Sequence, residues 1–280
     1  MDCFALRQVF RKIITSFSSR AEFTGRSFIS RFHRHGRQKP ARNRAFFCIT
    51  TKEYNMQTFD KQWNQVHGSR NWGRYPAEEL VRFMARNYYS GDRSKVRVLD
   101  LGCGTGANTW FLCREGFSTV AFDGAFVATT KAARLCSELS TTASFLQADA
   151  GLLPFKNETF DVVADIGALS ANSSAGIRQI LQEICRVLKP GGRVFSSVLF
   201  TQSTSGYKTG ERIDSHSFRN IEHGPVAGLG TIHFFTRAEI KKVWQNAGFE
   251  EPLIDVITRT DHGGSLRVSF YTAMARKPEK

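Results

Sequence analysis

The strongest candidate for a functional site in this sequence is a set of three glycines at alternate positions, with an acidic residue just before them. Asp100 precedes Gly102, Gly104 and Gly106, and a short apolar run leads into them. Glycine lets the backbone turn sharply and lets a ligand approach without a Cβ in the way. A helix that begins after such a turn presents unpaired N–H groups to a carboxylate or another anion. We therefore predict a ligand-binding turn at this segment.

Two further acids fall where the next two apolar runs end. Asp123 follows the first of these runs and precedes Gly124, and Asp149 follows the second and precedes Ala150. A carboxylate in the first position suits two ribose hydroxyls, and one in the second suits the exocyclic amine of an adenine. Together with the glycine turn, they predict a site for an adenosine that carries an amino-acid tail.

The elements that must position these residues alternate along the chain. We expect strands at 96–101, 119–122, 144–147, 160–166 and 193–200, and helices at 107–114, 125–139 and 177–188. Thr236 and Glu239 form a capping box that opens one more helix, and strands 251–260 and 265–275 flank the turn of residues 261–264. This pattern predicts a doubly wound α/β fold, with a seven-stranded, mostly parallel sheet that ends in an antiparallel hairpin. Ligands bind such sheets beyond the carboxyl ends of the strands, where the glycine turn and both acids lie.

The remaining segments divide the chain into a leader and one domain. We expect a leader over residues 1–55 and a domain over 56–280. The domain begins with a helical lid at 56–93, which residues 71–76 interrupt, and continues with a cofactor-binding core at 94–200. A substrate loop at 201–235 and the last helix and hairpin at 236–277 complete it.

The positive charge of the chain is concentrated in the leader. Residues 1–55 hold 12 of the 39 Lys and Arg and 3 of the 25 Asp and Glu, a balance of +9 out of +14. We therefore expect no stable nucleic-acid partner for the domain. The leader is interpreted first as a disordered or non-native extension before Met56, with the protein in the cytoplasm. Its Arg-rich amphipathic pattern also fits a mitochondrial targeting segment for an import receptor, or contact with an anionic membrane.

The first motif resembles that of the class I S-adenosylmethionine-dependent methyltransferases. Asp100-x-Gly102-x-Gly104-x-Gly106 is similar to the first motif of this family, and Leu188-Lys-Pro-Gly-Gly192 is similar to its late motif. Asp123 and Asp149 fall where the family has its ribose and adenine contacts. The resemblance implies a Rossmann-like methyltransferase fold with S-adenosylmethionine as cofactor. It implies these cofactor-binding residues: Asp100, Gly102, Cys103, Gly104, Gly106, Asp123, Gly124, Asp149, Ala150 and Ile166.

The expected reaction is methyl transfer to an oxygen or nitrogen atom of a small-molecule acceptor. Such an acceptor can need a base, and a neutral imidazole suits that task near neutral pH. His216, His223 and His233 lie in or beside the substrate loop and are candidates, without an assignment. We expect no metal site, because these histidines lack paired ligands at short helical or turn spacing. The scattered cysteines are expected to be reduced thiols.

Three alternatives stay open. Gly102-x-Gly104-x-x-Ala107, with Asp123, also fits the fingerprint of an NAD(P)-dependent oxidoreductase, although Asp149 and the terminal hairpin argue against it. The basic leader would suit an RNA methyltransferase, but the domain shows no basic stripe beyond Lys241-Lys242. A binding module without catalysis is the third alternative.

Overall fold

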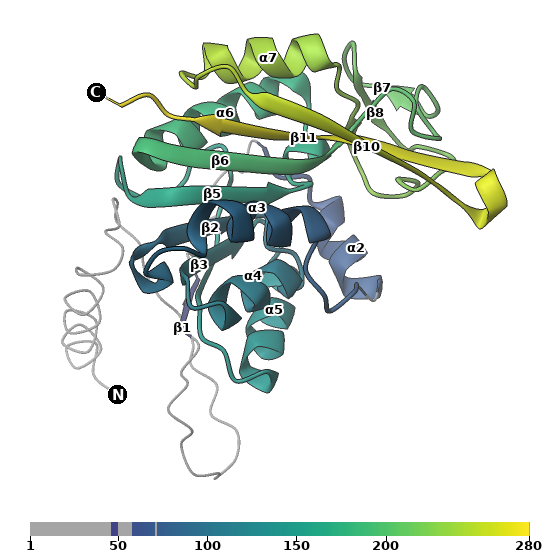
Figure 1. The fold of residues 1–280 in the computed structure, drawn as a ribbon. Helices are drawn as coiled ribbons and strands as arrows, with labels where there is room; N and C mark the ends of the chain where they lie inside the picture. The colour runs from purple at the N-terminus through teal and green to yellow at the C-terminus, as the bar shows by residue number, and fades with distance from the viewer. Residues whose placement is uncertain (1–45, 50–57, 71, 280) are drawn as a thin grey trace.

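An eight-stranded sheet forms the centre of the computed structural model, which describes residues 46–49, 58–70 and 72–279 (Figure 1). The strands run in the order β1-β4-β3-β2-β5-β6-β11-β10. They span β1 Phe46–Ile49, β2 Arg97–Leu101, β3 Ser118–Asp123, β4 Ser144–Gln147, β5 Phe160–Ile166, β6 Leu188–Phe200, β10 Leu253–Asp261 and β11 Leu266–Arg276. All seven expected strands are therefore present.

The sheet has the predicted doubly wound topology. Strands β2 to β6 run parallel, and β11 pairs antiparallel with both β6 and β10. The chain proceeds from β2 outward through β3 and β4, and then returns to the other side of β2 as β5. The strand order thus reverses between β2 and β5, which is where such folds bind ligands.

The first strand comes from the segment that we assigned to the leader. Strand β1 pairs in parallel with β4 at the edge of the sheet, with Phe46 opposite Ser144 and Ile49 opposite Gln147. Periodicity could not reveal this pairing, because an edge strand of four residues is too short to show a pattern. The Arg-rich amphipathic pattern near the start of the leader lies outside the described residues.

Helices cover both faces of the sheet. They are α2 Gln62–Ser69, α3 Glu78–Tyr88, α4 Ala107–Arg114, α5 Phe126–Glu138, α6 Ser174–Val187 and α7 Arg237–Asn246, with short 3-10 turns η1 Arg93–Lys95, η2 Leu169–Ala171 and η3 His262–Gly264. Because side chains alternate along a strand, Leu99 and Val163 pack with α6 and α7, whereas Val98 and Val162 pack with α3 and α4. Figure 1 shows α3 on one face and α6 beyond the other.

The turn expected at 189–192 lies within β6 as a bulge. Phe160 pairs with Leu188 and Val162 with Arg193, so four residues of β6 loop out between these pairs. Gly191 sits there with φ +74°, which favours glycine. Asp161 accepts the backbone N–H of Arg97 at 2.8 Å and pairs with Lys189 at 2.7 Å, a structural role at the far end of the sheet.

The expected substrate loop contains a second small sheet. Strands β7 Glu211–Arg212, β8 Ser217–Arg219 and β9 Ile232–His233 pair antiparallel. Phe218, Ile232 and Phe234 of this region form an apolar cluster with Val66 of α2. The N-terminal helical region and the 201–235 region therefore pack against each other over the sheet. Within the described part of the chain, no helix has the length and apolar character needed to cross a membrane.

Candidate functional site

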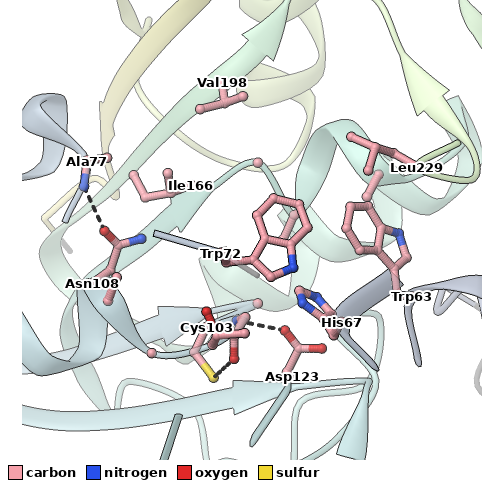
Figure 2. Close-up of a pocket in the computed structure, with 18 of the residues that line it drawn as sticks. Trp63, His67, Trp72, Ala77, Cys103, Asn108, Asp123, Ile166, Val198 and Leu229 are labelled. Carbon is pink, nitrogen blue, oxygen red and sulfur yellow. Dashed lines mark hydrogen bonds between the residues drawn. The ribbon is translucent and has the colours of Figure 1, made fainter. Parts of the chain in front are cut away.

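A cavity of about 720 Å³ opens at the carboxyl edge of the sheet, where the strand order reverses (Figure 2). Its floor is the predicted glycine turn between β2 and α4, together with the end of β3 at Asp123. Helix α2 and the segment before α3 form one wall, and the ends of β5 and β6 form another. The 225–232 segment, which precedes and enters β9, closes the far side.

The glycine turn is built from backbone that other residues would strain. Gly102 has φ +68°, and a Cβ there would lie 2.5 Å from the Cβ of Ala168. Gly106 caps α4 with φ +95°, and a Cβ there would lie 2.6 Å from the Cα of Ala132. Both positions therefore require glycine. The turn leaves a cradle along the floor of the cavity, as the sequence predicted.

Cys103 lies in this turn as a small buried residue. Its backbone N–H donates to the carbonyl of Phe122 at 2.9 Å, which ties the turn to β3. Burial raises the pKa of the Cys103 thiol well above its usual value, and the nearby carboxylates raise it further. Because the thiolate is the reactive form of cysteine, these effects disfavour a nucleophilic role for this side chain.

Asp123 holds the turn and still has acceptor capacity for a ligand. Its two carboxylate oxygens accept the N–H of Gly104 at 2.9 Å and the N–H of Ala125 at 2.8 Å. Each carboxylate oxygen has two lone pairs, so one on each remains available. Burial raises the pKa of Asp123, whereas the two N–H donors and nearby His67 oppose that effect. The residue lines the cavity, where a pair of ribose hydroxyls would meet it.

Asp100 lies beneath the turn instead of facing the cavity. Its side chain is 1% exposed and accepts the hydroxyl of Thr109 in α4. Burial raises its pKa to about 7, and Asp123 adds a smaller effect in the same direction. The expected cofactor role of Asp100 is therefore indirect: it fixes the start of α4 under the cradle.

The carboxylate of Asp149 is occupied by the chain itself. It accepts the hydroxyl and the backbone N–H of Thr58 and the N–H of Gly151. The neighbouring Ala150 lines the cavity, but Asp149 does not. The contact to an adenine amine thus stays a prediction, and it requires Thr58 to share or release this carboxylate.

The other expected cofactor residues line the cavity. Gly124 does so beneath Phe59, whose ring atoms come within 2.1 Å of where a Cβ of this glycine would stand. Ile166, at the end of β5, also lines it, and the backbone continues along the wall as Gly167 and Ala168. This placement agrees with a reaction site beside the end of β5.

The three candidate base histidines do not reach the cavity. His216, His223 and His233 are all outside its lining. Ile232 lines the cavity, and because neighbours on a strand face opposite ways, His233 points away from it toward Glu239. A base must lie within hydrogen-bonding reach of the acceptor, so this arrangement favours none of the three candidates as the base.

A different histidine, His67 of α2, lines the cavity. Its ring lies 5.3 Å from the Trp63 ring and 5.5 Å from the Trp72 ring, centroid to centroid, and Figure 2 shows it beside Asp123. Burial lowers its pKa, Asp123 opposes this and Lys131 adds to it. Its buried Nδ1 has no hydrogen-bond partner within the described residues. No local pattern in the sequence pointed to His67, apart from its place on a helix with Trp63.

Four features of the cavity's own residues fit S-adenosylmethionine. The glycine turn lines the floor of the cavity and begins α4, whose N–H groups suit a carboxylate. Asp123 keeps lone pairs for ribose hydroxyls. The unpartnered Nδ1 of His67 can bond to the cofactor beside it. The lining charges are mostly acidic, which suits a ligand with a cationic sulfonium.

Comparisons with known proteins agree with this geometry. Residues 98–192 match the family model described as a methyltransferase domain. The chain is similar to demethylmenaquinone methyltransferase of Lactococcus lactis, with 37% identity over 210 residues that cover 68% of this chain and 77% of that protein. It is also similar to the tRNA N(3)-cytidine methyltransferase METTL2 of Gallus gallus, with 25% identity over 72% of this chain and 57% of that protein.

The fold has solved counterparts as well. A SAM-dependent methyltransferase structure from Methanosarcina mazei superposes with a TM-score of 0.58 at 22% identity, over 70% of this chain and 98% of that one. The chain spans about half or less of the length of several other curated relatives that it matches. The glycine cradle, the aspartate at the end of β3 and the Lactococcus relative together show that this chain belongs to the class I S-adenosylmethionine-dependent methyltransferases.

Proposed function

We propose that this protein transfers a methyl group from S-adenosylmethionine to an oxygen or nitrogen atom of a small, largely apolar molecule. The supporting observation is the wall of the cavity beyond the cofactor cradle. Apolar side chains from four separate parts of the fold line it: Trp72, Val198, Phe200, Leu229, Ile232 and Phe270. Such a wall excludes water and suits a ring or a hydrocarbon acceptor.

The charge of the lining argues against a nucleic-acid acceptor. Arg259 is the single Lys or Arg among the described lining residues, against the acids Asp60, Glu78, Glu79 and Asp123. Proteins that bind nucleic acids neutralise phosphates with several cationic side chains, which this cavity does not offer. The similarity to METTL2 makes tRNA the second acceptor to test.

Bound S-adenosylmethionine would supply a methyl group that its positive charge already activates for displacement. The protein's own task is then to hold the acceptor in line with that methyl group in a dry cavity. Asp123 and the glycine turn would hold the bound cofactor from below, and helix α2 would cover it with Trp63 and His67. The backbone from Ile166 to Ala168, beside Val198, lies at the junction of the cradle and the apolar wall.

The experiment supplies cofactor with a radiolabelled methyl group to the purified chain. Three acceptor pools are offered: an apolar metabolite extract, a polar metabolite extract and total tRNA. We expect label in an apolar small molecule, and a large loss of transfer in Asp123→Asn, while Asp161→Asn, at the opposite end of the sheet, keeps it. Label that enters tRNA alone, or no transfer to any pool by a protein that binds the cofactor, would contradict the proposal.

A further inference from the structure

A cluster of two histidines and one glutamate lies behind the wall of the cavity, outside the site described above. His216 precedes β8, His233 ends β9 and Glu239 stands in the first turn of α7. The two Glu239 oxygens lie 3.0 Å from Nδ1 of His216 and 3.1 Å from Nε2 of His233. One potential ligand atom from each residue lies within 4.8 Å of the other two. The tertiary fold thus brings together ligands that are separated in the sequence.

Hydrogen bonds at the back of His233 favour a lone pair on the nitrogen that faces Glu239. Nδ1 of His233 lies 2.7 Å from the Ser217 hydroxyl, which donates its proton to Asp214 at 2.9 Å. Asp214 accepts three backbone N–H groups, those of Ser174, His216 and Ser217, so its carboxylate is the acceptor in this network. Nδ1 must then be the donor to Ser217. In the neutral imidazole this leaves a lone pair on Nε2 opposite the Glu239 carboxylate, and the two acceptors can share either the proton of an imidazolium or a metal ion.

We propose that His216, His233 and Glu239 bind a divalent transition-metal ion, of which zinc is the best example. Two imidazoles and one carboxylate are a common protein ligand set for zinc, and a fourth position stays open to water. Zinc ligands commonly have an outer hydrogen bond that fixes the histidine tautomer, and the chain Asp214–Ser217–His233 supplies one. This inference does not depend on which acceptor the enzyme methylates.

The surroundings give the ion both shelter and access. The side chain of His233 is 0% exposed, that of Glu239 is 19% exposed and that of His216 is 28% exposed. The ion would therefore enter from the His216 side. Zinc–nitrogen bonds of about 2.0–2.1 Å require the two imidazoles to close on the ion. The closure would be a side-chain movement, because the backbone of His216 is hydrogen-bonded to Asp214 and to Phe234.

The ion would act on the cavity through β9. Ile232 faces the cavity and the adjacent His233 faces the cluster, so a metal bond to His233 holds the strand that carries part of the acceptor wall. Glu239 joins this strand to α7, which packs on the main sheet through Trp244. We therefore assign the ion a structural role: it fastens the 201–235 region to the core.

The test titrates zinc sulfate into the full chain, after treatment with a chelator, by calorimetry. The variants are His216→Gln, Glu239→Gln and, as the matched control, His262→Gln at the exposed hairpin turn. The backbone N–H of residue 239 still donates to the Thr236 hydroxyl oxygen in the glutamine variant, so this variant retains the N-cap of α7. Because other histidines and cysteines can also bind zinc, the comparison between variants is the result, not the total stoichiometry.

We expect wild type and His262→Gln to bind one more zinc ion per chain than His216→Gln and Glu239→Gln bind. Ser217→Ala should still bind this zinc ion, with an affinity roughly 10- to 100-fold weaker than that of wild type. Zinc at about 100 times Kd should raise the melting midpoint of wild type by about 5 °C or more, and leave that of folded His216→Gln unchanged. Equal zinc stoichiometry in all variants, or no equivalent at all in wild type, would overturn the proposal.

Discussion

Asp123→Asn is the substitution that tests the cofactor site most directly. The carboxylate accepts the N–H of Gly104 and of Ala125, one on each oxygen, and keeps one lone pair per oxygen for ribose hydroxyls. Asparagine retains the shape but offers a single acceptor oxygen and no charge. The NH₂ group of the asparagine must face the backbone N–H of either Gly104 or Ala125, so two hydrogen-bond donors oppose each other and that N–H loses its acceptor.

The structure gives the size of both effects. A buried N–H that loses its acceptor costs about 1–3 kcal/mol, so Asp123→Asn should lower the free energy of unfolding by about that amount. Loss of a hydrogen bond to a charged acceptor costs the cofactor about 1.5–3 kcal/mol. This loss corresponds to a Kd for S-adenosylmethionine that is roughly 10- to 100-fold higher.

Calorimetry with S-adenosylmethionine and with its demethylated product measures the affinity, and denaturant unfolding measures the stability. Asp161→Asn is the matched control, because Asp161 also accepts a backbone N–H, from Arg97, but at the opposite end of β5. It should lose stability and keep the cofactor affinity of wild type. If folded Asp123→Asn binds S-adenosylmethionine as tightly as Asp161→Asn does, the ribose role of Asp123 is refuted.

Three further predictions concern the turn and its neighbours. The pKa of Asp100 in the folded protein is about 7, above its usual 3.8. Between pH 3.8 and pH 7 the folded state therefore keeps a proton that the unfolded state has released, so stability falls as the pH rises across this range. The free energy of unfolding of Asp100→Asn, measured in denaturant melts, should therefore rise by about 2–4 kcal/mol relative to that of wild type between pH 5 and pH 8. An equal difference between the two proteins at both pH values would contradict this. Gly106→Ala should lower the free energy of unfolding by about 2 kcal/mol more than Gly116→Ala does in the same melts. Both glycines have positive φ, but only a Cβ at position 106 would collide with Ala132. His67→Phe should keep the fold and raise the Kd for S-adenosylmethionine roughly 3- to 10-fold, whereas an unchanged Kd would show that Nδ1 makes no contact with the cofactor.

The sequence by itself determined the sheet and the cradle. The strands and helices of the core show their periodicity within a few residues, and the glycine turn identifies itself because Gly102 and Gly106 adopt a backbone that other residues strain. Asp123 could be placed for a related reason. The end of a parallel strand next to the first one must lie at the same edge as the turn.

Contacts between distant segments decided the rest. The sequence could not show that Thr58 occupies Asp149, that His67 approaches Asp123, or that β1 pairs with β4. The surroundings of the loop histidines depend on the same kind of contact: the pairing of β8 with β9 turns His233 away from the cavity, and the fold brings α7 beneath it. Local patterns fix which backbone a segment adopts, whereas the partner of a side chain depends on how elements far apart in the chain pack, and only the tertiary structure contains that information.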